Sequence, residues 1–212
     1  MKYKGIIFDL DGVLCSTDRY HYLAWKTVAD RLGIYFDETI NHRLRGVSRM
    51  ESLEIILERA GRSFSPEEKQ ALAEEKNDLY RSLLSRMTAD DLSGEVKATL
   101  DALRGKGLRL GVGSSSKNTR TILDRIGLGG WFDAISDGNN ITRSKPDPEV
   151  FLKAAEYLGL SPADCLVVED AVSGLQAAAA AGMDAAAVGD AAGSGLAVYS
   201  LGTFADLLKC VE

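Results

Sequence analysis

The chain has 212 residues, of which 45% are hydrophobic and 26% are charged, a composition typical of a globular protein. Its net charge of −6 argues against a nucleic-acid partner, because an acidic surface repels a phosphate backbone. No apolar run reaches the roughly 18 residues that cross a membrane, and the first residues lack the pattern of a secretory signal. We therefore expect a cytoplasmic protein without a membrane partner and, by default for a compact acidic chain, a monomer.

Four short apolar runs along the chain indicate buried strands. The strands are predicted at residues 5–8, 108–113, 166–168 and 184–188. Helical patterns are found at residues 97–104, 118–126, 149–158 and 172–181. Strands that alternate with helices predict an α/β fold with a Rossmann-like parallel sheet, whose ligands bind beyond the carboxyl ends of the strands.

Between the first strand and about residue 95, the chain shows helical patterns without a convincing strand. These helices are predicted at residues 20–32, 52–60 and 67–84. Ser65 and Pro66 begin the last of them, as an N-cap serine followed by a proline in the first turn. We predict a helical cap domain at residues 16–92, inserted into an α/β core formed by residues 1–15 and 93–212.

Acidic residues follow two of the predicted strands. Asp9 and Asp11 come after the first strand and point the same way in an extended chain, so they repel each other unless a cation or a proton lies between them. Glu169 and Asp170 end another strand and add carboxylates to the same edge of the sheet. A polar turn and a helix N-cap are the alternatives for the two pairs, but together the four residues indicate an oxygen-only site that suits Mg²⁺.

A second polar group follows the strand at residues 108–113. Ser114-Ser115-Ser116-Lys117-Asn118 opens a helix, where hydroxyls, backbone N–H groups and a lysine can bind an anion. An ordinary N-cap is the alternative. Lys145 lies in Ser144-Lys145-Pro146-Asp147-Pro148. A single lysine in a loop is usually solvated, so a role in the site is indicated only by the presence of the other three motifs.

The four motifs in this order resemble the haloacid dehalogenase superfamily over nearly the whole chain. The resemblance implies that Asp9 attacks phosphorus and forms an aspartyl-phosphate, with Asp11 as the general acid and base. It also implies that Ser114 and Lys145 hold the transferring phosphoryl group, and that Asp9, Asp11, Glu169 and Asp170 form the Mg²⁺ site. A nucleophilic aspartate divides one difficult displacement into two easier ones, and cations offset its repulsion of a phosphate dianion.

Motifs in the helical insertion resemble the β-phosphoglucomutase family of that superfamily. They are Gly46-Val47-Ser48-Arg49, Lys76-Asn77 and Tyr20-His21-x-x-Ala24-Trp25. The resemblance implies a cap that closes over a sugar phosphate. It also implies an enzyme that interconverts β-glucose 1-phosphate and glucose 6-phosphate. The implied substrate-binding residues are Thr17, His21, Trp25, Leu44, Arg45, Gly46, Val47, Ser48, Arg49, Ser52, Lys76, Ser115, Ser116, Lys117 and Asn118.

Three functional alternatives remain open at the level of sequence. A sugar-phosphate phosphatase shares the core residues, a mutase for another β-phosphosugar shares the cap residues, and a non-enzymatic binding module could retain the fold. The sequence also departs from the family pattern at Cys15-Ser16 in the hinge, at Arg45, where a lysine is expected, and at residues 137–140, which we expect to form a differently shaped loop. For the cap residues, Trp25 could be core, His21 a surface histidine and Lys76 part of a solvated helix face.

Overall fold

A six-stranded parallel sheet lies at the centre of the computed structural model, which describes residues 2–45 and 47–211. The strand order is β3-β2-β1-β4-β5-β6, and every neighbouring pair is parallel. The strands are β1 (Gly5–Phe8), β2 (Arg109–Gly113), β3 (Ala134–Ser136), β4 (Cys165–Glu169), β5 (Asp184–Ala187) and β6 (Tyr199–Ser200). The predicted α/β class is confirmed. The prediction lacks β3 and β6, which have three and two residues and are too short to show a period.

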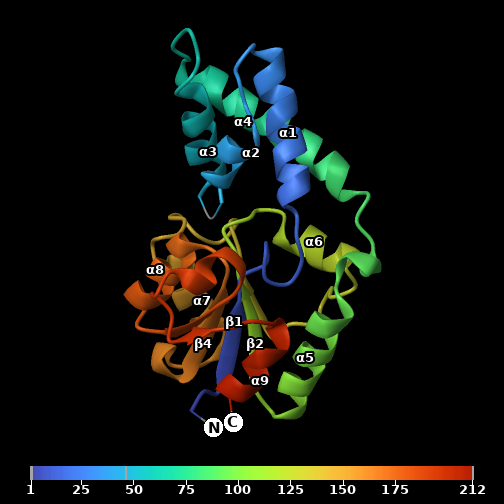
Figure 1. Cartoon of the computed structure of the whole chain (residues 1–212), viewed down its shortest axis with the longest axis vertical. Helices are drawn as coiled ribbons and strands as arrows, with labels where there is room; N and C mark the ends of the chain where they lie inside the picture. Colours follow the sequence, from blue (N-terminus) through green and yellow to red (C-terminus); the bar gives the residue numbers. More distant parts are fainter. Residues whose placement is uncertain (1, 46, 212) are drawn as a thin grey trace.

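Helices cover both faces of the sheet (Figure 1). The helices around the sheet are α5 (Gly94–Gly105), α6 (Thr119–Arg125), α7 (Glu149–Leu158), α8 (Val172–Ala180) and α9 (Leu207–Cys210). Because successive side chains of a strand point to opposite faces, Ile6 and Phe8 of β1 pack in the cluster that includes residues of α5 and α6, whereas Ile7 packs with residues of α7 and α8. All three side chains are fully buried, as expected for a strand covered on both faces.

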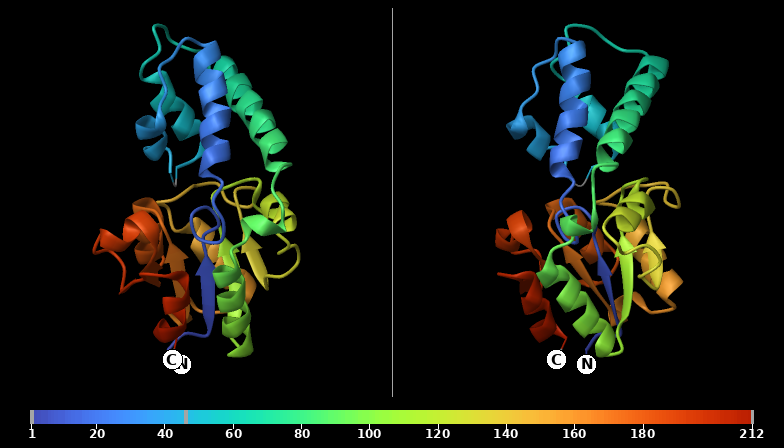
Figure 2. Two further views of the ribbon diagram at one scale, coloured as in Figure 1. Left: turned by 45° about the vertical axis from the view of Figure 1, so that its right-hand side comes forward. Right: turned by 90° about the vertical axis from the view of Figure 1, so that its right-hand side faces the viewer.

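Four helices pack together beyond the carboxyl ends of the strands, at the upper end of the molecule in Figures 1 and 2. They are α1 (Asp18–Arg31), α2 (Glu38–His42), α3 (Arg49–Leu57) and α4 (Pro66–Leu84). The group has its own buried cluster, to which Trp25, Val28, Phe36 and Leu53 belong. Residues 16–92 remain a predicted cap domain. None of the described helices is both long enough and apolar enough to span a membrane.

Local sequence explains where these helices begin. Ser65 accepts a hydrogen bond from the backbone N–H of Glu68, and the Glu68 carboxylate accepts one from the backbone N–H of Ser65. Ser48 and Glu51 form the same reciprocal pair at the start of α3. Such capping boxes satisfy backbone donors that have no partner inside the helix. The cap of α3 therefore fixes the residue that follows it, Arg49, at the edge of the site described below.

Four short 3-10 segments complete the chain: η1 (Ala89–Asp91), η2 (Pro162–Asp164), η3 (Gly189–Gly193) and η4 (Phe204–Asp206).

Candidate active site

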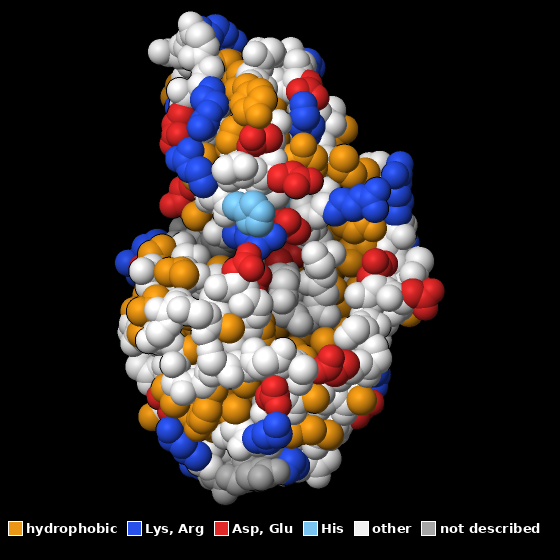
Figure 3. All heavy atoms as spheres, viewed as in Figure 1, with side chains coloured by type: hydrophobic (Ala, Val, Ile, Leu, Met, Phe, Trp, Pro, Cys, Tyr) orange, Lys and Arg blue, Asp and Glu red, His pale blue; other side chains and the backbone are white. Residues whose placement is uncertain are grey.

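A cavity of about 690 Å³ is lined by residues at the carboxyl ends of the strands and by residues of α1 to α4. Figure 3 shows basic and acidic side chains gathered side by side at the waist between the larger and smaller parts of the molecule. The predicted site residues in the cavity wall are Asp9, Asp11, Thr17, His21, Trp25, Leu44, Arg45, Val47, Ser48, Arg49, Ser52, Lys76, Ser114, Ser115, Ser116, Lys117, Asn118, Lys145, Glu169 and Asp170. Gly46 lies outside the described residues. The structure therefore brings together residues that are spread over most of the sequence.

The floor of the cavity contains a buried cluster of charged residues. Asp9 follows β1, and its backbone N–H donates to the carbonyl oxygen of Val168 on β4 at 2.9 Å, which fixes the start of the turn. The Lys145 Nζ atom lies 2.5 Å from an Asp9 oxygen and 2.8 Å from a Glu169 oxygen. Burial alone would lower the pKa of Lys145, but the two carboxylates outweigh it and raise the pKa. Lys145 is therefore positively charged and holds Asp9 in place.

The same floor could hold a divalent metal. One carboxylate oxygen each from Asp9, Glu169 and Asp170 lie within 4.8 Å of one another. Burial, and after it the charge of Asp9, raises the pKa of Asp170 to about 7, so the cluster is short of positive charge even with Lys145 present. Three crowded oxygen donors fit Mg²⁺, which accepts few protein ligands. Asp11 is outside this group among the described residues, and its place in the metal site remains a prediction.

Gly12 allows the chain to pass close to this cluster. Its φ angle of 82° lies in the left-handed region, and a Cβ atom there would come within 2.0 Å of an Asp170 oxygen. A side chain at this position would therefore be strained and would also displace a candidate metal ligand.

Asp11 is held by a chain of hydroxyl groups instead. The Tyr80 hydroxyl donates to Thr17 at 3.0 Å, and the Thr17 hydroxyl donates in turn to the Asp11 carboxylate. Burial, and after it the charge of Asp9, raises the pKa of Asp11 to about 6. A carboxyl group whose pKa is close to neutrality can both accept and return a proton.

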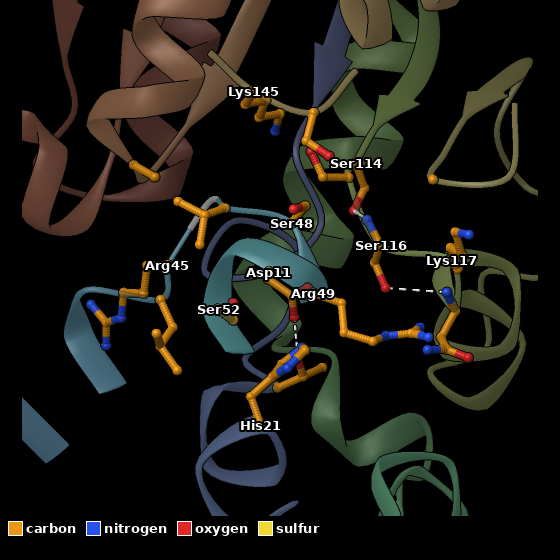
Figure 4. Close-up of a pocket in the computed structure, with 18 of the residues that line it drawn as sticks. Asp11, His21, Arg45, Ser48, Arg49, Ser52, Ser114, Ser116, Lys117 and Lys145 are labelled. Carbon is orange, nitrogen blue, oxygen red and sulfur yellow. Dashed lines mark hydrogen bonds between the residues drawn. The ribbon is translucent and has the colours of Figure 1, made fainter. Parts of the chain in front are cut away.

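The loop after β2 curls at the end of the strand. Ser114 accepts from the backbone N–H of Ser116 at 3.2 Å, and Ser116 accepts from the backbone N–H of Asn118 at 3.1 Å. Figure 4 shows these side chains on the same side of the cavity, with the Arg49 side chain reaching toward them. Residues 137–140 support this loop from behind, since Gly138 donates to the carbonyl oxygen of Ser116 at 3.0 Å. The loop thus presents hydroxyls, amides and the exposed Lys117 to a common space.

The roof of the cavity carries cations. Lys76 is only 3% exposed, so it is not part of a solvated helix face. Its Nζ atom lies 2.8 Å from Nδ1 of the half-buried His21 and 5.0 Å from the ring centre of Trp25. Trp25 is buried and belongs to the hydrophobic core of the upper helices, while it also lines the cavity. Among the described residues, no carboxylate forms an ion pair with Lys76 or Arg49. Burial, and after it the charge of Arg49, lowers the pKa of Lys76 to about 7. Burial, and after it the charges of Lys76 and Arg49, lowers the pKa of His21 well below its usual value.

Arg45 forms a different contact on the opposite wall. Its guanidinium lies 2.5 Å from Asp190 on η3 and 3.0 Å from Asp18 at the start of α1. The hydrogen bond that Arg45 donates to Asp18, together with the negative charges of Asp18, Asp190 and Asp170, raises the pKa of Arg45. The arginine that replaces the expected lysine thus connects α1 with η3, the segment that follows β5.

Several lining residues are absent from the predicted set: Asp18, Asn41, Asn77, Tyr80 and Asp190. Tyr80 could have been found, because it lies four residues after Lys76 and so on the same face of a helix. Asp190 had no such signal, since only the folded chain brings it near Arg45. In the hinge, Cys15 is buried, whereas Ser16 is exposed and lines the cavity.

Comparison with known proteins gives one consistent picture. Residues 3–182 match the family model of haloacid dehalogenase-like hydrolases. The β-phosphoglucomutase of Bacillus subtilis is 44% identical over 188 residues, covering 88% of this chain and 83% of the relative. The fructose-1-phosphate phosphatase YqaB of Escherichia coli is 34% identical, covering 87% and 95%. The crystal structure of β-phosphoglucomutase from Clostridium difficile superposes with a TM-score of 0.91 at 38% identity, covering 97% and 93%.

Proposed function

This chain belongs to the haloacid dehalogenase-like hydrolases, and we propose that within them it is a mutase that interconverts β-D-glucose 1-phosphate and D-glucose 6-phosphate. The observation that carries the proposal is that one cavity contains two separate groups of side chains, each able to bind an anion. Ser114 and Lys145 lie beside Asp9 on the floor, whereas Arg49 of the roof faces the loop at Ser116–Asn118. A mutase needs both, because its substrate carries one phosphate while the other is transferred.

The chemistry divides into two transfers at Asp9. Phosphorylated Asp9 gives its phosphoryl group to the C6 oxygen of β-glucose 1-phosphate, and Asp11 takes the hydroxyl proton. The product, β-glucose 1,6-bisphosphate, then presents its C1 phosphate to Asp9. As the bond between phosphorus and the C1 oxygen breaks, Asp11 returns its proton to that oxygen, and glucose 6-phosphate leaves behind phosphorylated Asp9. The hydroxyl chain from Tyr80 through Thr17 holds Asp11 for both proton transfers.

We assign the remaining residues to binding. Asp9, Glu169, Asp170 and, from the family resemblance, Asp11 would hold Mg²⁺, which supplies positive charge against the phosphoryl oxygens when bound. Lys145 keeps Asp9 oriented for in-line attack. Thr17, His21, Trp25, Ser52 and Lys76 would line the sugar side of the closed cavity. Closure of the cavity would keep water away from phosphorylated Asp9.

The test is a coupled assay of glucose 6-phosphate formation from β- and α-glucose 1-phosphate, with Mg²⁺ and a trace of β-glucose 1,6-bisphosphate. We expect turnover of the β anomer alone. Release of inorganic phosphate without glucose 6-phosphate formation would overturn the proposal.

That outcome would favour the second candidate, a sugar-phosphate phosphatase. The 34% identity to a fructose-1-phosphate phosphatase supports it. The floor residues suit either reaction, so the choice rests on the roof. A mutase for another β-phosphosugar would instead form the isomeric phosphate of that sugar.

A further inference from the structure

The side chain of Asn77 lies where the roof meets the loop after β2. Its Oδ1 atom accepts from the Arg49 guanidinium at 2.8 Å and from the Asn118 amide at 3.0 Å. The orientation of both amides follows from chemistry: an arginine can only donate, so the atom of Asn77 that faces it must be the oxygen, and Asn118 must then present its NH₂ group. Asn77 is therefore a shared acceptor for two donors that come from different parts of the fold.

These two donors are those that the proposed function assigns to the phosphate that is not being transferred. Arg49 is on α3 and Asn118 is at the start of α6, 41 positions beyond Asn77 in the chain. Asn118 is 9% exposed, and Arg49 is half-buried. Donors in such a place need an acceptor to stay ordered, because a buried N–H group without a partner is costly.

The neutrality of the amide is what suits Asn77 to this place. A carboxylate would hold Arg49 more firmly, but it would cancel the charge that a phosphate needs and repel the anion. An apolar side chain would leave both donors without a common partner. An amide oxygen orients the donors and keeps the guanidinium charge available.

We propose that Asn77 is a positioning residue of the second phosphate site, which sets Arg49 and Asn118 at one point between the roof and the floor. The inference rests on the proposed function for the identity of the sugar and for its second phosphate. Compounds with an anion at that end gain from Asn77, and compounds without one do not.

The experiment compares Asn77→Asp and Asn77→Ala with the wild type. For isomerisation of β-glucose 1-phosphate, we expect Asn77→Asp to raise KM on the order of tenfold to a hundredfold, because the carboxylate offsets the charge of Arg49 and repels the phosphate. Asn77→Ala keeps the guanidinium charge and should raise KM less. Hydrolysis of p-nitrophenyl phosphate, which has no second anionic group, should keep its KM and kcat in both variants.

Two controls separate positioning from general damage. Ser82→Asp adds the same negative charge to an exposed position of α4 outside the cavity and should leave both reactions unchanged. Thermal melts of Asn77→Asp should match the wild type, because aspartate and asparagine have nearly the same shape. Equal changes in the two reactions, or no change in either, would overturn the inference.

Failure of the proposed function would be visible separately. If the wild type forms no glucose 6-phosphate, calorimetric binding of glucose 1,6-bisphosphate to Asp9→Asn, with and without Asn77→Asp, still measures the second site. We expect at least about tenfold weaker binding of the bisphosphate and unchanged binding of p-nitrophenyl phosphate. Unchanged bisphosphate binding would reject the role of Asn77 whichever reaction the enzyme performs.

Discussion

The floor and the roof of the cavity have opposite deficits of charge. The floor brings the carboxylates of Asp9, Glu169 and Asp170 around the single ammonium of Lys145. The roof contains Arg49 and Lys76, and no carboxylate of the described residues pairs with either. The excess of carboxylates on the floor thus favours the binding of a cation, and the cations of the roof favour the binding of an anion. A phosphorylated substrate with Mg²⁺ at its reacting end would satisfy both.

The largest effect should come from the floor. Asp9→Asn should reduce both isomerisation and aryl phosphate hydrolysis by several orders of magnitude, because an amide lacks the charge and nucleophilicity of a carboxylate. Lys145 keeps its contact with Glu169, so thermal melting should stay near that of the wild type. The matched control is Asp101→Asn, at an exposed position of α5, which should retain full activity. Substantial turnover by Asp9→Asn would remove the nucleophile assignment.

Removal of divalent metal should have a comparable effect on turnover. Chelation should stop both reactions, and added Mg²⁺ should restore them, since Lys145 alone leaves the floor carboxylates under-compensated. Ca²⁺ should bind and compete with Mg²⁺ without supporting efficient transfer, because its larger and looser shell misplaces the reacting oxygens. Full activity after thorough chelation, checked by metal analysis of the protein, would contradict the metal site.

On the roof, the sharpest test is Arg49→Ala. Its planar fork can donate two charge-assisted bonds to one phosphate. Loss of a buried charged partner costs about 2–5 kcal/mol, on the order of 30- to 5000-fold in rate. We expect a loss of this size in isomerisation and a much smaller loss in hydrolysis of p-nitrophenyl phosphate.

Arg49→Lys serves as the matched variant, because it keeps the charge and loses the fork. It should fall between wild type and Arg49→Ala. If both reactions fall by the same factor in Arg49→Ala, the roof does not hold a second phosphate and the phosphatase candidate moves ahead.

The difference between floor and roof also explains what the sequence could predict. Asp9, Ser114 and Glu169 each follow a predicted strand, and the carboxyl ends of parallel strands meet at one edge, so these floor residues could be placed together by topology alone. Lys145 follows no predicted strand, and its place on the floor came from the family resemblance. The roof residues come from helices whose packing angles no local pattern specifies. Their place had to come from family resemblance, and the contact between Asn77 and Asn118 required the folded chain. The strands β3 and β6 were missed for a related reason, because their pairing partners rather than their own residues define them.

The burial of Lys76, which has no ion-pair partner among the described residues, should affect the stability of the protein. Its pKa is about 7 in the folded protein against 10.5 for an exposed lysine, so between these values the unfolded chain binds more protons and the stability of the wild type rises with pH. Below about pH 7, Lys76 is protonated in both the folded and the unfolded chain, so the full free-energy cost of burying its charge lowers the stability of the folded protein. Lys76→Met removes that cost, so its gain in unfolding free energy should be largest near pH 6 and decline by about 2 kcal/mol toward pH 9.

Chemical denaturation at several pH values measures this difference directly. Lys69→Met, on the same helix but ion-paired with Glu54, provides the control and should show no such decline. A gain in unfolding free energy that grows with pH would mean that burial does not lower the pKa of Lys76.

The smallest effect should come from the ion pair between Arg45 and Asp190, which connects the chain after α2 with η3. The two side chains are 33% and 74% exposed, and exposed ion pairs contribute little because water and salt screen them. Asp190→Asn should therefore change KM for β-glucose 1-phosphate by no more than about fivefold at low ionic strength. The change should vanish at high salt, whereas the effect of Arg49→Ala should persist, since a half-buried charge is screened less. Arg45 would keep its second partner, Asp18. A loss in Asp190→Asn as large as that in Arg49→Ala, and insensitive to salt, would show that the exposed wall rather than the roof cation controls closure around the substrate.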